Sequence, residues 1–362
     1  MPTRAQILDK AVALRAGFER AGAIPVETPV LQPAETLLDL YGEDIRARAY
    51  VTSDALRGEQ MLRPDFTVPV VQMHMRDGAE PARYTYAGEV FRRQEEDEDR
   101  ANEYIQVGYE IFDRSNVAAA DAEVFALIAS ALNGLNLRAA TGDIGILMAA
   151  VGGLNTTDRR KTALMRHIWR PQRFRALLDR FGGRVEMPST RAALLAAADP
   201  FSGAGPEIGL RGRAEVAARI AALREDAQTP PIAAAELDAL EALLGVRETA
   251  PLALEHLRRI AAGLPRIEPA LDRLAARIDA LAERGVNVDK LDFEASYGRT
   301  SMEYYDGFVF GFYAGNRPDL PPIATGGRYD ALTRRLGEGA EIPAVGGVLR
   351  PGLMLELEEA AQ

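Results

Sequence analysis

Cysteine is absent from this chain of 362 residues, and histidine occurs only three times. The lack of cysteine excludes disulfides, thiolate nucleophiles and cysteine-based zinc sites, and it fits the reducing environment of the cytoplasm. The scarcity of histidine argues against a histidine-rich metal centre. We therefore expect a cytoplasmic protein without a metal site.

Long apolar runs and phosphate-binding glycine loops are missing as well. No stretch of about 18 consecutive apolar residues occurs, so we predict no membrane span. Residues 1–21 alternate charged and apolar side chains at helical spacing, which indicates an amphipathic helix rather than a signal peptide. Neither GxGxxG after a strand nor GxxxxGK[ST] is present, and we expect no bound cofactor.

Positive charge is in short supply. The formal net charge is -10 and the sequence pI is about 5.1. Binding to nucleic acid requires cations that displace the counterions condensed on phosphates, so an acidic chain has little general affinity for it. Small molecules and protein surfaces are therefore the expected partners.

The order of segments along the chain predicts an α+β fold. Residues 83–113 are typical of an antiparallel hairpin with an acidic tip, and a helix is expected over 119–135. Residues 157–285 are rich in Ala, Leu and Arg at helical spacing. Strand character returns after residue 290, without regular strand-helix alternation. We predict an antiparallel sheet flanked by helices, formed by 1–156 and 286–362, with an all-helical insertion at 157–285.

The second arm of the predicted hairpin has a polar face. Gln106, Gly108 and Glu110 share one side of the strand, because side chains alternate along a strand. Gln106 and Glu110 would lie roughly 13 Å apart, and Gly108 would leave room between them for a ligand the size of an amino acid. A solvated face of an amphipathic strand is the alternative, which this pattern alone leaves open.

Two further segments place polar groups inside apolar surroundings, where a plain core would not favour them. They are Leu62 to Thr67 (LRPDFT) and Glu303 to Gly307 (EYYDG). Together with other motifs in the same order, they make the chain resemble the catalytic core of histidyl-tRNA synthetase, a class II aminoacyl-tRNA synthetase. The other motifs are Val26 to Pro29, Phe91 and Arg92 with Arg100, Glu103 to Glu110, Gly326 to Asp330, and Pro343 to Gly346.

The resemblance implies a histidine pocket made by six residues: Asp65, Thr67, Gln106, Glu110, Tyr304 and Tyr305. The first three would hold the α-amino group, while Glu110 and Tyr305 would bind the imidazole. An imidazole has nitrogens on two edges, so a carboxylate and a phenol can pair with both and disfavour side chains that leave these groups unpaired. Asp65 stands where the family usually has Glu, which shortens its reach by one methylene.

The resemblance fails where the synthetases activate histidine. Adenylation requires cations directed at the triphosphate, and Arg92 and Arg100 match the expected positions as a vestigial nucleotide pocket. The arginine expected before the Tyr-Tyr pair is Thr300, the motif 3 arginine is Leu353, and a nucleotide-binding Glu is Gln94. Arg299 and Arg350 lie nearby, and only a small shift of register would let one of them compensate.

Five consecutive carboxylates, residues 95–99, occupy the loop that faces the tRNA acceptor end in the synthetases. They would repel a polyphosphate backbone, although a simple solvated loop is also compatible with them. The chain ends one helix after the motif 3 position, so we expect no anticodon-binding domain. With these departures from the synthetases, the chain resembles the regulatory subunits of ATP phosphoribosyltransferase, which are paralogues of the synthetase.

That second resemblance implies a function without catalysis. The expected partners are the short-form catalytic subunit of ATP phosphoribosyltransferase, a second copy of this chain in a class II-type dimer, and L-histidine as effector, with no tRNA. Histidine binding would control the first step of histidine biosynthesis. Two alternatives remain: an enzyme that still adenylates histidine, such as a truncated synthetase-like ligase, and a generic α+β interaction protein.

Overall fold

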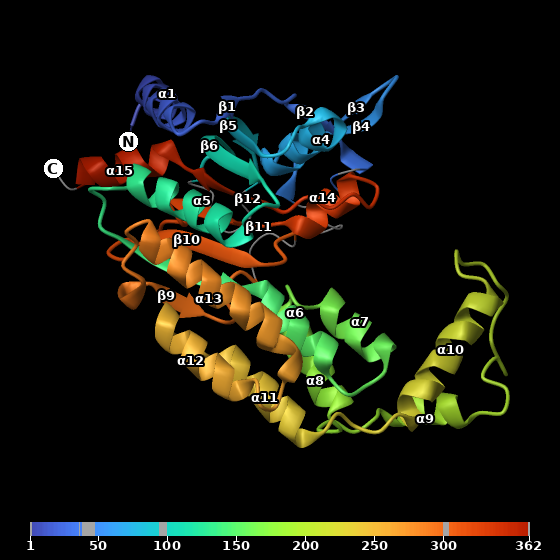
Figure 1. Ribbon diagram of the computed structural model, residues 1–362. Helices are drawn as coiled ribbons and strands as arrows, with labels where there is room; N and C mark the ends of the chain where they lie inside the picture. The colour runs from blue at the N-terminus through green and yellow to red at the C-terminus, as the bar shows by residue number, and fades with distance from the viewer. Residues whose placement is uncertain (1, 36, 38–47, 94–99, 300–303, 361–362) are drawn as a thin grey trace.

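A computed structural model describes residues 2–35, 37, 48–93, 100–299 and 304–360. Figure 1 shows the chain folded around one large sheet, with both termini on the same side of it. Within this part of the chain, no helix combines the length and apolar character needed to cross a membrane. The same residues contain no group of three His, Asp or Glu side chains suited to a metal ion.

The central sheet has nine strands in the order β1-β5-β6-β12-β11-β10-β7-β9-β8. The β1–β5 and β7–β9 pairs are parallel and the other pairs are antiparallel. This confirms the predicted α+β sheet, with two parallel pairs toward its edges. In that order the strands are β1 (Ile24–Pro25), β5 (Ala82–Phe91), β6 (Glu103–Phe112), β12 (Ala344–Leu349), β11 (Ala324–Arg328), β10 (Phe308–Ala314), β7 (Leu137–Asp143), β9 (Asp292–Glu294) and β8 (Arg247–Thr249).

The predicted hairpin is present as β5 and β6, which pair along their whole length from Phe91 with Glu103 to Ala82 with Phe112. Its predicted acidic tip, 95–99, lies outside the described residues. A separate small sheet contains β2 (Leu31–Pro33), β4 (Gly58–Leu62) and β3 (Val51–Asp54). It leads the chain directly into Arg63 to Asp65, beside the central sheet.

Helices cover one face of the central sheet. The helix α1 (Arg4–Arg20) packs on β5 and β6, α5 (Val117–Ala131) packs on β12, and α15 (Pro351–Ala360) packs on β6. Inward-facing side chains such as Tyr109, which contacts Phe18 of α1, fill the layer between them. On the opposite face, α4 (Thr67–Asp77) packs against α14 (Asp330–Leu336). The polar face of β6 is turned toward α4.

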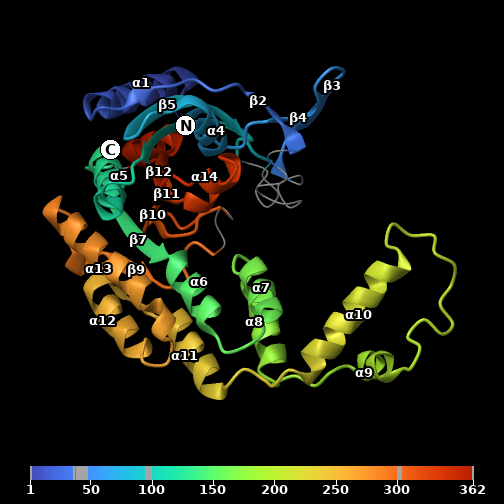
Figure 2. The same cartoon turned by 45° about the vertical axis from the view of Figure 1, so that its right-hand side comes forward.

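The segment predicted to be an all-helical insertion, 157–285, is mostly helical but includes β8. This strand has only three residues and pairs with β9, so no local alternation in the sequence marks it. Figure 2 shows α9 and α10 standing away from the other helices. The remaining helices are α6 (Ile144–Gly153), α7 (Asp158–Arg166), α8 (Pro171–Phe181), α9 (Ser189–Ala196), α10 (Arg213–Gln228), α11 (Ala234–Gly245), α12 (Ala250–Ile260), α13 (Glu268–Glu283), and the short turns η1 (Pro265–Ile267) and η2 (Val288–Lys290).

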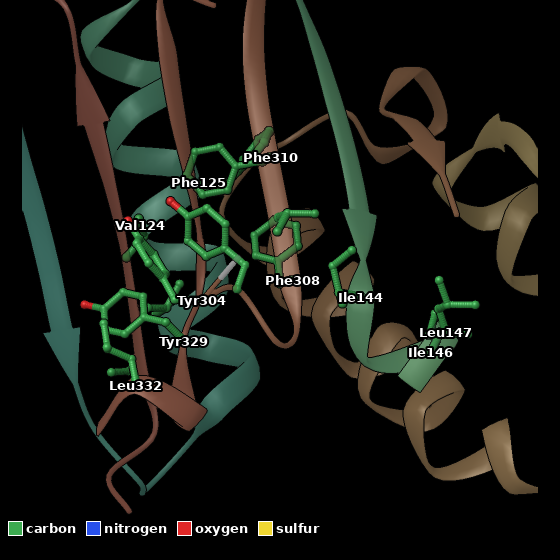
Figure 3. Close-up of a cluster of buried hydrophobic side chains, with 14 of the residues drawn as sticks. Val124, Phe125, Ile144, Ile146, Leu147, Tyr304, Phe308, Phe310, Tyr329 and Leu332 are labelled. Atoms are coloured by element: carbon green, nitrogen blue, oxygen red, sulfur yellow. The ribbon is translucent and has the colours of Figure 1, made fainter. Parts of the chain in front are cut away.

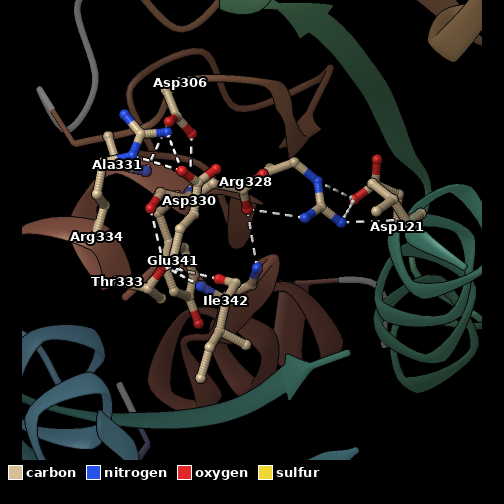
Figure 4. Close-up of polar contacts among 12 residues, drawn as sticks. Asp121, Asp306, Arg328, Asp330, Ala331, Thr333, Arg334, Glu341 and Ile342 are labelled. Carbon is tan, nitrogen blue, oxygen red and sulfur yellow. Dashed lines mark hydrogen bonds and ion pairs between the residues drawn. The ribbon is translucent and has the colours of Figure 1, made fainter. Parts of the chain in front are cut away.

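A buried chain of ion pairs joins α13 to the sheet. Asp121 of α5 pairs with Arg277 of α13 at 2.8 Å and with Arg328 of β11 at 2.6 Å. Arg277 also reaches Asp143 at 2.9 Å, and Arg328 reaches Asp330 at 2.9 Å. Figure 4 shows the Arg328 end of this chain. Each charge in this set of five residues therefore has an opposite partner, as a low-dielectric interior requires.

Candidate functional site

The face of the sheet opposite α1 and α5 carries glycines at which side chains lie against the backbone. A Cβ at Gly346 would lie 1.4 Å from Oε2 of Glu110, and one at Gly108 would lie 2.0 Å from the Tyr86 ring. A Cβ at Gly327 would lie 2.7 Å from the ring of Tyr305. Three polar side chains thus occupy space that exists only because these positions are glycine.

Glu110 lies at the centre of this face and is 1% exposed. Its Oε1 accepts hydrogen bonds from the hydroxyls of Thr67 at 3.1 Å and Tyr86 at 2.8 Å, and its Oε2 accepts one from Tyr329 at 2.5 Å. Burial raises the pKa of Glu110 from 4.5 to about 7, although the three hydroxyl donors oppose the change. The carboxyl group is therefore able to change its protonation state near neutral pH.

The predicted space above Gly108 is occupied by the protein itself. The ring of Tyr86, from the neighbouring strand β5, lies over Gly108 and stacks on Phe66 with 4.3 Å between ring centroids. Strand alternation correctly placed Gln106, Gly108 and Glu110 on one face, but it contains no information about a neighbouring strand. The open middle that the sequence suggested is therefore corrected: the ring of Tyr86 fills it.

Gln106 is 1% exposed, and its Oε1 has no hydrogen-bond partner in the described part of the protein. It lies on β6 opposite Gly88 of β5. A buried carbonyl oxygen without a donor costs roughly 1–3 kcal/mol. Such an atom is accounted for by a donor that a ligand or a water supplies.

Asp65 and Thr67 lie at the start of α4, and both are buried. The carboxylate of Asp65 accepts a long hydrogen bond of 3.5 Å from the backbone N–H of Val68, and Arg92 lies 3.8 Å from it. Thr67 connects this turn to Glu110 through its hydroxyl. The helix start therefore holds a buried anionic group near the polar face of β6.

Tyr304 and Tyr305 complete the group. Burial raises the pKa of the Tyr305 hydroxyl above its usual value, and the charges of Glu110 and Asp65 raise it further, which places Tyr305 near both carboxyls. The ring of Tyr304 lies 4.8 Å from that of Tyr305 and 6.2 Å from that of Tyr329. Figure 3 shows Tyr304 and Tyr329 among the buried apolar side chains of the core.

The segment before β10 fixes Tyr329. Asp306 accepts hydrogen bonds from the backbone N–H groups of Asp330 at 3.0 Å and Ala331 at 2.7 Å, as Figure 4 shows. These bonds hold the beginning of α14, directly after Tyr329. Burial raises the pKa of Asp306 to about 7, and the nearby charge of Asp330 adds to the shift. Tyr86 and Tyr329 are site residues that the sequence did not single out, although Tyr329 lay within a recognised motif.

The arginines of the predicted vestigial nucleotide pocket bind the backbone. Arg92 donates to the carbonyl of Pro64 at 2.7 Å, and Arg100 donates to the carbonyl of Asp319. Of the two possible substitutes, Arg299 lies away from the pocket, with its Nε 2.8 Å from the carbonyl of Ile168 and its guanidinium 4.7 Å from the Phe174 ring. Arg350 lies within electrostatic reach of Arg92 and Tyr305.

Leu353, the residue at the motif 3 position, lies on α15 and packs against the apolar core. No cation therefore comes from the motif 3 position. Thr300, Gln94 and the acidic run 95–99 lie outside the described residues, so the expectations attached to them stay predictions.

The sequence profile of the family described as histidyl-tRNA synthetase matches residues 2–208 and 211–351. The chain is 32% identical over 360 residues to the ATP phosphoribosyltransferase regulatory subunit of Brucella anthropi, covering 92% of this chain and 93% of that protein. The corresponding protein of Brucella ovis is 32% identical over 356 residues, covering 92% and 93%.

Solved structures show the same fold. A protein from Bacillus halodurans, described as an ATP phosphoribosyltransferase regulatory subunit/histidyl-tRNA synthetase, has a TM-score of 0.69 at 21% identity, covering 98% of this chain and 79% of that one. A histidine–tRNA ligase subunit from Alicyclobacillus acidocaldarius has a TM-score of 0.60 at 23% identity, covering 100% and 95%. At these identities the structures support the fold alone.

Proposed function

This chain belongs to the family of ATP phosphoribosyltransferase regulatory subunits, which share the histidyl-tRNA synthetase fold, and from that membership we propose that it binds L-histidine and controls a short-form catalytic subunit. The name of the family implies a catalytic partner. Histidine binding, allosteric control and the absence of catalysis by this chain itself are the proposed part. Histidine would thereby regulate the first step of its own biosynthesis.

The unpartnered Oε1 of Gln106 is the observation that carries the proposal. A buried acceptor without a donor, together with the buried anionic Asp65, is suited to an ammonium group, which supplies donors and positive charge to both. The α-amino group of an amino acid provides this chemistry. Asp65, Thr67 and Gln106 would form the part of the pocket that binds it.

The imidazole would bind about one side-chain length away, at Glu110 and Tyr305. Glu110 already accepts three hydroxyl hydrogen bonds, so an imidazole N–H would replace one of these donors rather than fill a vacant position. Because the replacement keeps the carboxylate paired, it favours ligands with a donor at that point. An apolar side chain would break a hydrogen bond without replacing it, which gives selectivity for histidine.

Regulation requires that histidine bind two states of the assembly unequally. A coupling of about 1–3 kcal/mol between the histidine site and the catalytic subunit is typical of allosteric proteins. A ligand with equal affinity for both states would change nothing, however tightly it bound. We propose that the histidine-bound assembly is the less active one, and that this subunit is also needed for full activity.

The second candidate is an enzyme that still adenylates histidine, and the presence of Arg92 and Arg350 near the pocket favours it. Leu353 argues against it, because the side chain at that position is apolar and packs against the core. Histidine-dependent exchange of pyrophosphate into ATP tests this activity directly, and we expect none. We further propose a dimer of this chain, and no binding of tRNA because of the net charge of -10.

Reconstitution of the complex tests the main proposal. The purified chain is mixed with a short-form catalytic subunit, and formation of phosphoribosyl-ATP is measured with and without histidine. We expect the mixture to be more active than the catalytic subunit alone, and histidine to lower the activity of the mixture. Equal activity with and without this chain would contradict the proposed role.

Two variants test the pocket. Glu110→Gln and Tyr305→Phe should each weaken the histidine response about tenfold or more, because each removes a partner of the imidazole. Assembly with the catalytic subunit, followed by gel filtration, should not change. Tyr109→Phe is a matched control, since its hydroxyl donates to Glu123 at 2.7 Å on the opposite face of the sheet. If both pocket variants respond to histidine as the wild type does, the pocket is assigned incorrectly.

A further inference from the structure

Arg350 follows the last residue of β12 and lies on the pocket side of the sheet. Leu349 pairs with Val107 of β6, and Gly346 pairs with Glu110. Continued alternation would place the side chain of position 350 on the face that carries Gly346, at the level of Gln106. The guanidinium of Arg350 bonds the hydroxyl of Tyr104 and lies within electrostatic reach of Tyr305, which places it beside the pocket.

The polar partners of Arg350 are all neutral. It donates to the carbonyl of Pro322 at 2.7 Å and to the hydroxyl of Thr325 at 3.3 Å, and it bonds the hydroxyl of Tyr104. Among the described residues no carboxylate pairs with it. The charged side chain that acts on it is Arg92, which repels it. Burial lowers the pKa of Arg350 from its usual value, because the charged form lacks compensation.

Some buried arginines of this protein donate to backbone carbonyls, as Arg299 does to Ile168, and others pair with carboxylates. Arg277 binds Asp121 and Asp143, and Arg328 binds Asp121 and Asp330. Arg350 is only partly buried, but its charge still lacks an anion, and pairing with a ligand anion would stabilise the complex. The surroundings of Arg350 are therefore suited to a ligand that supplies the missing anion.

We propose that Arg350 binds the α-carboxylate of the bound amino acid and thereby selects a zwitterion over an amine. This inference rests on the proposed function, since it concerns the same pocket. The order of charges supports it: Asp65 and Gln106 offer acceptors for an ammonium group, and Arg350, beside the pocket, offers donors for a carboxylate. A guanidinium is well suited to this role because its planar N–H groups match a carboxylate.

L-Histidinol provides the probe, because it has the imidazole and the amine of histidine but a hydroxymethyl group in place of the carboxylate. Calorimetric titration of the full chain, alone and mixed with the catalytic subunit, should show wild type binding histidine about 10 to 100 times more tightly than histidinol. In Arg350→Gln the affinity for histidine should fall to near that for histidinol. The affinity for histidinol itself should change little.

Two further variants separate a contact with the ligand from a structural effect. Arg350→Lys keeps the charge and should restore part of the preference for histidine. Arg138→Gln is the control, because Arg138 forms an exposed ion pair with Asp292 on another strand, and it should leave both affinities unchanged. Thermal unfolding of each variant confirms that it is folded.

The outcomes distinguish the two proposals. If Arg350→Gln weakens histidine and histidinol by the same factor, Arg350 only supports the pocket; this inference then fails while the histidine site stands. An unchanged preference for histidine in Arg350→Gln overturns it as well. If wild type binds neither compound, alone or with the catalytic subunit, the proposed histidine site itself is wrong.

Discussion

At the scale of single residues, the chemistry of the pocket depends on Glu110. Its carboxyl group is buried, receives three hydroxyl hydrogen bonds, and has its pKa raised by burial from 4.5 to about 7. Between these two pH values the folded protein retains a proton that the unfolded chain releases. Folding stability is therefore linked to pH through this residue.

We expect Glu110 to make the protein less stable as the pH rises. Since the folded-state pKa is raised, the contribution of the proton is fully present below about pH 4.5 and is lost as the pH passes through about 7. Between pH 5 and pH 8, wild type should lose on the order of 3 kcal/mol of unfolding free energy relative to Glu110→Gln. Urea unfolding of both proteins at several pH values measures this difference.

The comparison with Glu110→Gln removes the contribution of other groups. Asp306, whose pKa is also raised to about 7, titrates in both proteins and cancels in the difference. The glutamine keeps a carbonyl oxygen to accept hydroxyl hydrogen bonds, so the variant should fold. Curves of stability against pH that run parallel in the two proteins would show that folding does not raise the pKa of Glu110.

Pocket residues were predictable from the sequence where they belong to a recognised motif. Asp65, Thr67 and Glu110 were expected together, and the structure brings them together. Tyr86 was missed because its role arises from a neighbouring strand that passes over Gly108, a relation that alternation within one strand does not contain. Arg350 was considered only as a substitute for another arginine, because its pairing with neutral groups is visible only in three dimensions.

At the scale of elements, the pocket depends on how closely β6 and β12 approach. Gly346 of β12 pairs with Glu110 of β6, and the carboxylate lies against the position where a side chain would begin. The hairpin of β5 and β6 was predictable from strand-forming residues in both arms and from the alternation of Ile105, Val107, Tyr109 and Ile111 in β6. The position of β12 next to β6 was not, because that pairing joins segments more than 200 residues apart.

Gly346→Ala tests this close approach. An added Cβ would lie 1.4 Å from Oε2 of Glu110, so the carboxylate must move and lose its hydrogen bond from Tyr329. We expect a loss of about 1–3 kcal/mol in unfolding free energy, as is typical of overpacking, together with a loss of the histidine response. Urea unfolding and histidine titration measure the two effects.

Gly352→Ala is the matched control for this substitution. Gly352 is six residues further along, in α15, and its Cβ would meet only the flexible end of Ile7 at 3.5 Å. Its stability should stay within about 1 kcal/mol of wild type, because alanine is favoured over glycine in a helix. A Gly346→Ala protein that binds histidine normally would mean that the carboxylate of Glu110 need not lie where it does.

At the scale of the whole molecule, two distant parts of the sequence form one sheet. Strands from 24–143 and from 292–349 pair with each other, so the chain on either side of the helical segment is joined by β6 with β12 and by β7 with β10. The helices α9 and α10 contribute little to this core: α9 has no buried residue, and α10 has only Ile220 and Ala222. The alanine-rich composition predicted helices there, but it did not reveal how few buried side chains they have.

Limited digestion with trypsin should therefore cut the chain first around α9 and α10. Arg191, Arg211 and Arg213 lie in this region, where local unfolding costs little because few apolar contacts are lost. Denaturing gels should show two fragments of similar size, while gel filtration shows one species of unchanged volume. The two halves should stay together because the nine-stranded sheet is built from both.

The cut protein should also keep its affinity for histidine, since every proposed contact with the ligand comes from the sheet, the start of α4 and the segment at Tyr304 and Tyr305. Calorimetric titration before and after digestion measures this. Fragments that separate in gel filtration would show that α9 and α10 hold the sheet together. Loss of histidine binding by an intact pair of fragments would instead place part of the histidine site in the helical segment.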